Sequence, residues 1–483
     1  MKEKMRVRFA PSPTGYLHIG GFRTALYNYL LAKKNDGEMI LRIEDTDRTR
    51  YVENAIEDLI EALDWCGIRY DEGVYLNAEK KVIQKGQYGP YIQSQRLDIY
   101  QKYVSKLIEK HHAYYCFCSK ERVDDLRAMQ AKNNLTPKYD KKCLSLSQEE
   151  IHRKIQAGEE YTIRLNLPLD TIIEFDDEVF GHISFNTNDM DDQVLIKSDG
   201  FPTYHFAVVV DDFLMKITHV IRGEEWISST PKHVYLNQVL GFEQPKYIHL
   251  PTVLNTSRKK LSKRNDDAAV EDFKAKGYLP QALTNFVALL GWSSSNEEEI
   301  MDMDKLISSF DSARINKSGA IFDIDKLNWM NTQYIKNYDS SALARLCQPF
   351  LTKECGMDKL ILIVEAIRDK MVLLSDINAL SEVIFHKDFI DEEARAILNM
   401  PNSSTVLKAL KEGIENTAEL NSEEINKIIK SIQNEYKIKG KDLYMPIRVA
   451  STGQVHGADL SKIMAAIGRK ELLNRIEEEI KKF

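Results

Sequence analysis

The sequence predicts an α/β protein whose doubly wound parallel sheet is split by an α+β insertion and followed by an all-helical region. Three observations support this fold class. Strand and helix patterns alternate up to about residue 66, the alternation resumes after about residue 200, and helical patterns dominate from about residue 325. Alternating strands and helices are typical of a parallel sheet with helices on its faces. The chain of 483 residues is long enough for several domains.

The amino-terminal residues supply the first part of the predicted sheet. Residues 5–10 alternate in polarity like a short strand, and a turn rich in proline and glycine runs from Pro11 to Gly21. Residues 22–34 then show the apolar face of a helix. A second strand over 39–43 and a second helix over 53–66 complete a βαβα unit.

The alternation resumes beyond the insertion. Residues 203–210 are rich in β-branched side chains, so we expect a strand there. A strand over 217–222, a helix over 231–240 and a strand over 247–250 follow. The insertion, at roughly residues 100–200, carries turn residues and short strands, which favours an α+β domain. Those short strands are expected over 161–165 and 182–186.

The last part of the chain has helical periodicity and few stretches that resemble strands. We therefore expect an all-helical carboxyl-terminal region with two subdomains. The expected helices span 325–331, 341–350, 359–374, 392–398, 404–414, 422–436 and 470–481.

Charge and composition exclude some classes of protein. The 66 basic and 73 acidic residues give a net charge of −7, which argues against a protein that coats nucleic acid through bulk charge. An RNA binder with local basic patches remains open, and residues 258–264 form such a patch. No apolar run is long enough to cross a bilayer and no signal peptide is visible, so we expect a cytoplasmic protein without a membrane partner. Six cysteines do not indicate a disulfide framework.

Two short segments about 240 residues apart carry groups suited to phosphate. The turn that contains His18-Ile-Gly-Gly21 lies at the carboxyl edge of the predicted sheet, where its glycines and the following helix N-terminus favour phosphate. The segment Lys260-Leu-Ser-Lys-Arg264 concentrates positive charge. Taken alone, each segment has an ordinary alternative: a glycine-rich turn with a surface histidine, and a solvated basic turn. The phosphate-binding motif G-x-x-x-x-G-K-[ST] does not occur.

In order and spacing these segments resemble the two signatures of class I aminoacyl-tRNA synthetases. Arg42-Ile-Glu-Asp-Thr-Asp47 and Val210-Asp-Asp212 narrow the resemblance to the bacterial-type glutamyl-tRNA synthetases, along essentially the whole chain. The resemblance implies a Rossmann-type catalytic domain, an inserted domain that binds the tRNA acceptor end, a stem-contact domain with the basic loop, and a helical anticodon-binding region. These would occupy, in turn, residues 1–100 with 201–254, 101–200, 255–335 and 336–483.

The resemblance also implies the reaction. Glutamate would be activated by ATP as glutamyl-adenylate and then transferred to the 3′-terminal ribose of tRNA(Glu), with Mg²⁺ on the phosphates. His18, Lys260 and Lys263 would stabilise the charge that develops on the phosphates. Gly21 stands where the fullest signature has a second histidine. The implied ATP contacts are Pro11, Gly15, His18, Gly20, Gly21, Leu261, Ser262, Lys263 and Arg264.

Charge pairing would select the amino acid. Arg8 and Arg222 are candidates for the γ-carboxylate of L-glutamate, because a buried arginine rejects the neutral amide of glutamine. Glu44 would meet the ammonium group, although residues 44–47 also fit a helix N-cap with acidic first-turn residues. The residues placed around glutamate by resemblance are Arg8, Ser12, Glu44, Tyr204, Arg222 and, beside the pocket, Trp226.

Three cysteines form a candidate metal site. Cys116, Cys118 and Cys143 would supply thiolates, which suit zinc, but a closed zinc site has four ligands. Some relatives have a histidine at the position of Ser145, and Tyr139 is an alternative fourth ligand. Structural zinc and three buried thiols both remain open.

Four other functions share part of these features. Glutaminyl-tRNA synthetase is the nearest alternative, but that family reads the anticodon with β-barrels. A truncated relative that modifies a tRNA base lacks an anticodon domain, and a small-molecule nucleotidyltransferase would not need the helical third. A catalytically inactive tRNA-binding paralogue would not need all the motif residues. The sequence leaves open whether tRNA(Gln) is also charged, and a monomer is usual in the family.

Overall fold

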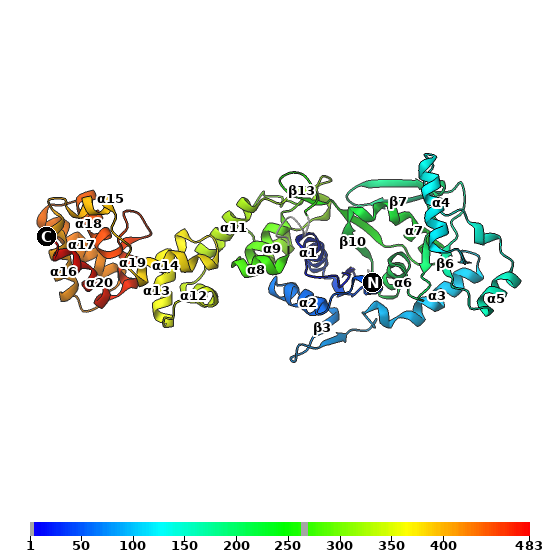
Figure 1. Ribbon diagram of the computed structural model, residues 1–483, viewed down its shortest axis with the longest axis horizontal. Helices are drawn as coiled ribbons and strands as arrows, with labels where there is room; N and C mark the ends of the chain where they lie inside the picture. The colour runs from blue at the N-terminus through cyan, green and yellow to red at the C-terminus, as the bar shows by residue number, and fades with distance from the viewer. Residues whose placement is uncertain (1–3, 262–268) are drawn as a thin grey trace. The chain divides into compact units, whose positions relative to one another are not determined.

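The computed structural model describes residues 4–261 and 269–483, which divide into two compact units. The first unit comprises residues 1–272 and 284–323, and the second comprises 273–283 and 324–483. All strands of the described residues belong to the first unit, and Figure 1 shows the second as helices joined by loops. No helix in the described ranges is long and apolar enough to span a membrane.

Two four-stranded sheets form the centre of the first unit. In one, β1 (Arg6–Phe9), β2 (Glu38–Leu41) and β3 (Glu72–Leu76) run parallel, and β4 (Val82–Lys85) is the antiparallel edge. In the other, β10 (His219–Gly223), β11 (Lys246–Leu250) and β7 (Ile172–Asp177) run parallel, with β8 (Gly181–Asn186) antiparallel.

The two sheets meet at β1 and β10. The Thr218 N–H beside β10 donates to the Arg6 carbonyl of β1 over 2.9 Å. From this boundary the strands proceed outward in both directions, β2 and β3 on one side and β11 on the other. Such a switch point in strand order is where ligands bind in doubly wound folds.

Helices surround these strands. Most of α1 is buried, and no acidic residue lies in its first turn. The helices confined to the first unit are α1 (Ile19–Lys34), α2 (Ala55–Trp65), α3 (Leu97–Glu109), α4 (Lys120–Lys132), α5 (Gln148–Gln156), α6 (Tyr204–Leu214), α7 (Thr230–Leu240) and α10 (Met303–Ser309). Two further helices, α8 (Val270–Lys276) and α9 (Pro280–Ala288), contain the boundaries between the units.

The strand expected over 203–210 is wrong, because these residues begin helix α6. The β-branched run Val208-Val-Val210 is buried throughout, at 4% exposure or less. A short apolar run that is buried on every side has no diagnostic periodicity, so it looks the same in a strand and in a helix. Burial then outweighs the small helix penalty of valine. As a result, Asp211 and Asp212 lie on the same buried helix.

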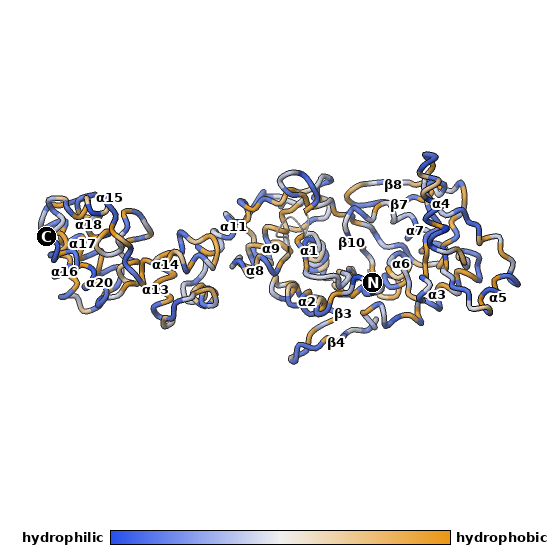
Figure 2. The backbone as a smooth tube through the Cα atoms, viewed as in Figure 1, coloured by the Kyte–Doolittle hydropathy of each residue, from blue (hydrophilic) through white to orange (hydrophobic). Residues whose placement is uncertain are grey.

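The inserted region contributes to two sheets. Its strands β5 (Ala113–Cys116), β6 (Thr162–Leu165) and β9 (Val194–Ile196) form a separate antiparallel sheet. The strand expected over 182–186 is β8, and it extends the main sheet together with β7. Figure 2 shows α4 as mostly hydrophilic, in agreement with its single buried residue, Val123. The last short pair joins β12 (Val253–Leu254) to β13 (Ala320–Ile321).

The expectation of helices without strands is confirmed for residues 324–483, all of which are described. One hydrophobic core runs through the second unit, from Leu279 to Ile476. Its helices are α11 (Ile324–Asn337), α12 (Ser340–Cys347), α13 (Met357–Ile367), α14 (Ile377–Phe385), α15 (Glu392–Leu398), α16 (Ser403–Asn416), α17 (Ser422–Tyr436), α18 (Lys441–Thr452), α19 (Leu460–Ile467) and α20 (Arg469–Ile480).

Two features of this unit differ from the expectation. Helices α14, α18 and α19 were not anticipated, and the helix expected over 359–374 ends at Ile367. The Asp376 carboxylate accepts hydrogen bonds from the backbone N–H groups of Val372 and Leu373, both over 2.8 Å. This local side-chain acceptor competes with the helical hydrogen bonds and favours a turn.

Candidate active site

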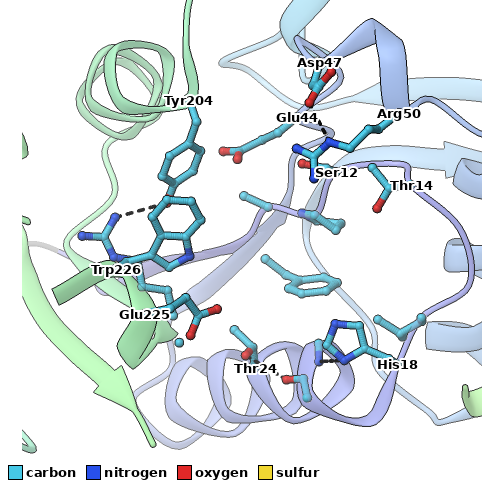
Figure 3. A pocket seen from close by; sticks show the side chains of 18 of the residues that line it. Ser12, Thr14, His18, Thr24, Glu44, Asp47, Arg50, Tyr204, Glu225 and Trp226 are labelled. Atoms are coloured by element: carbon cyan, nitrogen blue, oxygen red, sulfur yellow. Dashed lines mark hydrogen bonds and ion pairs between the residues drawn. The ribbon is translucent and has the colours of Figure 1, made fainter. Parts of the chain in front are cut away.

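A cavity of about 1220 Å³ opens at the switch point between β1 and β10. Figure 3 shows His18 on one side of it and Tyr204 with Trp226 on the other. Within the described ranges, every residue predicted to contact ATP or glutamate lines this cavity: Arg8, Pro11, Ser12, Gly15, His18, Gly20, Gly21, Glu44, Tyr204, Arg222, Lys260 and Leu261. The remaining predicted residues, Ser262, Lys263 and Arg264, lie outside the described residues.

His18 is the N-cap residue of α1. Its Nδ1 accepts a hydrogen bond from the Gly21 N–H over 3.1 Å, so in the neutral ring Nε2 carries the proton. A Cβ at Gly20 would lie 3.1 Å from the His18 ring, and one at Gly21 would lie 3.2 Å from Leu17. Gly20 therefore leaves room for the imidazole at the helix N-terminus, and Gly21 leaves room for the Leu17 side chain. A protonated Nε2 beside a helix N-terminus is suited to an anionic ligand.

The two signature segments converge on this cavity. His18 forms an antiparallel bridge with Ala269, and the Val270 N–H donates to the Leu17 carbonyl over 2.9 Å. At the other end of the basic segment, Leu261 lines the cavity, and its N–H donates to the Val253 carbonyl over 3.0 Å. The residues on both sides of 262–268 are thus anchored at the site, although the segments are about 240 positions apart.

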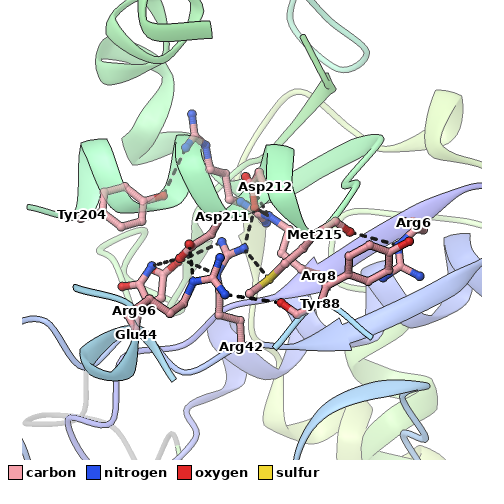
Figure 4. A network of polar contacts seen from close by, with 12 residues as sticks. Arg6, Arg8, Arg42, Glu44, Tyr88, Arg96, Tyr204, Asp211, Asp212 and Met215 are labelled. Carbon is pink, nitrogen blue, oxygen red and sulfur yellow. Dashed lines mark hydrogen bonds and ion pairs between the residues drawn. The ribbon is translucent and has the colours of Figure 1, made fainter. Parts of the chain in front are cut away.

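Buried arginines and carboxylates form a network of polar contacts (Figure 4), and two of its members, Arg8 and Glu44, line the cavity. Asp212 accepts from Arg8 Nε over 3.1 Å and pairs with Arg42 Nη1 at 2.8 Å. Arg42 Nη2 also donates to Glu44 Oε1 over 3.1 Å. Asp211 pairs with Arg96 Nε at 2.7 Å. The network contains three arginines and three carboxylates, so it is electrically balanced when every carboxylate is ionised. No motif indicated the role of Arg96.

Glu44 borders the cavity and is almost fully buried. Burial raises the pKa of its carboxyl group to about 7, and the charges of Arg42 and Arg8 oppose this rise. A cationic group in the cavity would favour the ionised form. The ionised carboxylate of Glu44 is therefore suited to a cationic ligand.

The N-cap interpretation of residues 44–47 holds for Asp47 alone. Asp47 caps a 3₁₀ turn over Arg48–Arg50, where its carboxylate accepts from Thr49 Oγ1 over 2.7 Å and from Arg50 Nε over 2.6 Å. These two hydrogen bonds lower the pKa of Asp47. Glu44 takes no part in this cap.

Arg222 differs from Arg8 in the charge of its partners. It is 5% exposed and donates to neutral acceptors. These are His249 Nε2 at 3.1 Å, His233 Nδ1 at 3.1 Å, Tyr204 Oη at 3.2 Å and Thr230 Oγ1 at 2.7 Å. Among the described residues, no ion pair includes Arg222, whereas Arg8 is paired with Asp212. The positive charge of Arg222 is therefore available to an anionic ligand.

Aromatic side chains complete this wall. The rings of Tyr204 and Trp226 lie 4.2 Å apart between centroids, at 36° to each other. Further cavity residues that no motif marked are Thr24, Arg50, Lys197 and Glu225. For Glu225, the sequence contained one indirect indication that it lines the cavity: it directly precedes Trp226, which the resemblance placed beside the pocket.

The cysteine cluster in the inserted region has the donor groups of a metal site. The sulfurs of Cys116, Cys118 and Cys143 lie within 4.8 Å of one another. Tyr139 Oη lies 3.3 Å from both Cys116 Sγ and Cys118 Sγ. Hydrogen bonds from Cys143 and Tyr139 lower the pKa of Cys116, which favours a thiolate. Ser145 is exposed and its hydroxyl bonds to the Lys142 carbonyl, so the four groups that fit zinc are the three sulfurs and the phenol oxygen.

Comparisons with known proteins cover the whole chain. Residues 4–329 match the family described as class I tRNA synthetases (E and Q), catalytic domain, and residues 342–480 match an anticodon binding domain. The glutamate–tRNA ligase of Finegoldia magna is 53% identical over 99% of both chains, and that of Clostridioides difficile is 53% identical over 98% of both. The crystal structure of a glutamate tRNA ligase from Elizabethkingia meningosepticum, in complex with its amino acid, has a TM-score of 0.88 at 36% identity over 99% of each chain.

Proposed function

The chain belongs to the class I tRNA synthetases for glutamate and glutamine, and on that premise we propose that it attaches glutamate to tRNA(Glu) at the expense of ATP. The observation that carries the choice of amino acid is Arg222, a buried cation with neutral partners in the wall of the cavity. Relatives that are 51–53% identical over nearly their full length are glutamate–tRNA ligases, which favours glutamate over glutamine.

The amino acid would bind between Arg222 and Glu44. Arg222 takes the γ-carboxylate and Glu44 takes the ammonium group, with Tyr204 and Ser12 as hydrogen-bonding neighbours. Arg8 contributes positive potential, although Asp212 already compensates its charge. The neutral amide of glutamine would leave the guanidinium of Arg222 buried without a counter-charge, which costs several kcal/mol.

ATP would bind beside His18 and the N-terminus of α1. An oxygen of the glutamate α-carboxylate attacks the α-phosphorus of ATP. The bond from this phosphorus to the bridging oxygen of the leaving pyrophosphate then breaks. The His18 Nε2–H and the backbone N–H groups of the first turn stabilise the charge on the α-phosphate. Lys260 borders the cavity, and Lys263 and Arg264 are assigned to the pyrophosphate from their motif alone. When present on the phosphates, Mg²⁺ would supply further positive charge.

Transfer to tRNA completes the reaction. The 3′-terminal ribose hydroxyl attacks the carbonyl carbon of glutamyl-adenylate, and AMP leaves. We assign the inserted region, residues 101–200, to the acceptor end, residues 255–335 to the stem, and residues 336–483 to the anticodon. The match to an anticodon binding domain over 342–480 supports the last assignment. We also assign a monomer in the cytoplasm, where the tRNA substrate is found, and we leave tRNA(Gln) as a second substrate to be tested.

A structural zinc ion fits the inserted region. Three thiolates and the Tyr139 oxygen would complete a four-ligand site that joins the end of β5 to the loop before α5. Zinc at this position would stabilise the inserted domain and take no part in the chemistry.

One assay tests the proposed function. ATP–pyrophosphate exchange is measured with glutamate and with glutamine, each with and without tRNA. Exchange that requires glutamate supports the proposal, and the tRNA arm shows whether activation waits for tRNA. Exchange with glutamine in place of glutamate would assign the chain to the sister enzyme, and silence in every arm would leave a tRNA-binding paralogue.

A further inference from the structure

We propose that a chain of three histidines, two of them buried and one partly buried, holds Arg222 with neutral acceptors and thereby reserves its charge for an anionic substrate side chain. The chain, here called the histidine cradle, consists of His249, His233 and His205, with Asp177 at one end. The inference rests on the proposed function, because it explains how the glutamate site rejects glutamine. The cradle residues act through Arg222, so they are positioning residues.

The proton positions in His249 follow from the chemistry of arginine, which only donates hydrogen bonds. Arg222 Nε donates to His249 Nε2 over 3.1 Å, so this nitrogen carries no proton. His249 Nδ1 then carries the proton and donates to Asp177 Oδ2 over 2.7 Å. The same oxygen accepts the His249 backbone N–H over 3.0 Å. Asp177 therefore fixes the tautomer that accepts from Arg222.

His233 and His205 continue the chain by the same logic. Arg222 Nη1 donates to His233 Nδ1 over 3.1 Å, so the proton of His233 lies on Nε2. His233 Nε2 then donates to His205 Nδ1 over 3.0 Å. All three rings are neutral in this arrangement. Burial lowers the pKa of each, that of His205 to about 4, and the charge of Arg222 lowers them further.

The remaining partners of Arg222 are neutral as well. Thr230 Oγ1 accepts from Arg222 Nη2 over 2.7 Å, and its own proton goes to the Trp226 carbonyl over 2.8 Å. Tyr204 Oη accepts from Nη1 over 3.2 Å. The Arg222 guanidinium has five N–H bonds. Within the described residues, the contacts with His249, His233, Tyr204 and Thr230 use four of them.

A buried guanidinium without a negatively charged partner is unfavourable in free energy, and an anionic ligand would supply that partner. A carboxylate in place of His249 or His233, the two histidines that contact Arg222, would pair with the guanidinium directly, as Asp212 pairs with Arg8. Asp177 reaches Arg222 only through the His249 ring, so it orients the acceptor without forming an ion pair. The γ-carboxylate of glutamate then supplies the missing counter-charge, and a neutral amide does not.

A pair of variants of equal size separates charge from packing. In His233→Asn the side-chain oxygen takes the place of Nδ1 as a neutral acceptor, whereas His233→Asp has the same shape and a negative charge. We expect His233→Asn to raise the KM for glutamate only a few-fold. His233→Asp should raise it by about 100-fold and narrow the preference for glutamate over glutamine, while the KM for ATP changes little.

A second pair covers the case in which a carboxylate at the buried position 233 prevents folding. His205 is only partly buried, so His205→Asp is tolerated more easily and is compared with His205→Asn. The charged member should again raise the KM for glutamate more than the neutral member, with kcat changed less, but the effect is smaller because His233 intervenes.

The readouts are pyrophosphate exchange at varied glutamate, glutamine and ATP, with thermal melting as the measure of folding. If the Asn and Asp variants of the folded pairs raise the KM for glutamate equally, the cradle is packing only and the inference is overturned. If the unmutated chain fails to use glutamate, the proposed function is overturned as well. If the unmutated chain uses glutamate but the Asn and Asp variants have the same KM for glutamate, the inference about the cradle is overturned and the proposed function stands.

Discussion

The KM for glutamate should depend on pH through Glu44. Its carboxyl group borders the cavity, and burial raises its pKa from 4.5 to about 7. The rise corresponds to a net cost of about 3 kcal/mol for ionising Glu44, after the charges of Arg42 and Arg8 have offset part of the burial penalty, and a bound ammonium group would offset that net cost. Only the ionised form attracts that group, so binding weakens as the pH falls through 7.

The size of the effect follows from the fraction ionised. With a pKa of about 7, Glu44 is about one tenth ionised at pH 6 and about nine tenths ionised at pH 8. The KM for glutamate should therefore fall about tenfold between these values and become level above pH 8. The assay is steady-state pyrophosphate exchange at saturating ATP, with glutamate varied at each pH.

Two variants identify the titrating group. Glu44→Gln should raise the KM and remove its slope, whereas Asp47→Asn is the matched control. Thr49 and Arg50 lower the pKa of Asp47, so its carboxylate stays ionised between pH 6 and 8 and its removal should leave the slope in place. A tenfold slope that persists in Glu44→Gln would refute the assignment, because another group would then be titrating.

Four further predictions concern binding, chemistry, metal and fold. Arg222→Gln should raise the KM for glutamate by about 1,000-fold and the KM for ATP less than threefold, because it removes the charge partner of the γ-carboxylate; equal effects in exchange kinetics would contradict this role. Lys263→Ala should slow adenylate formation at least 100-fold in single-turnover assays while tRNA affinity in a filter-binding assay changes little, and near-normal turnover would remove Lys263 from the mechanism. Elemental analysis should find one zinc ion per chain and none in Cys143→Ser, and a metal-free protein with an unchanged melting temperature would contradict the zinc site. Gly73→Ala should destabilise the first unit by several kcal/mol in urea melts, because φ is +130° and a Cβ would overlap the Leu41 backbone.

The sequence predicted those parts of the fold that depend on local patterns. The strand over 5–10 and the helix over 22–34 correspond to β1 and α1, because alternation and helical periodicity are properties of neighbouring residues. The strand expected over 203–210 failed because total burial removes that periodicity. α18 was missed, and Pro446 lies inside it, a residue that ordinarily argues against a helix.

The candidate site also contains residues that the sequence predicted and residues that it did not. His18 and Glu44 stand in recognisable motifs, Arg222 was expected from charge pairing and the resemblance, and all three line one cavity. The partners that set their properties have no such signal. Arg96 pairs with Asp211 across 115 positions, and the histidine cradle joins β7, α6, α7 and β11. These contacts depend on the packing of distant elements, and no local pattern encodes them.

The charge balance of the site explains why two arginines in one cavity have different roles. Arg8, Arg42 and Arg96 face Glu44, Asp211 and Asp212, and this network is neutral only when Glu44 is ionised. Arg222 stands outside it with one positive charge. In the proposed binding mode, glutamate brings one ammonium group, which favours the ionised form of Glu44, and one γ-carboxylate, which pairs with Arg222. The α-carboxylate has no counter-charge in either group, and it is the group that would react with ATP. The proposed mode therefore compensates every charge of the substrate except that of the reacting carboxylate.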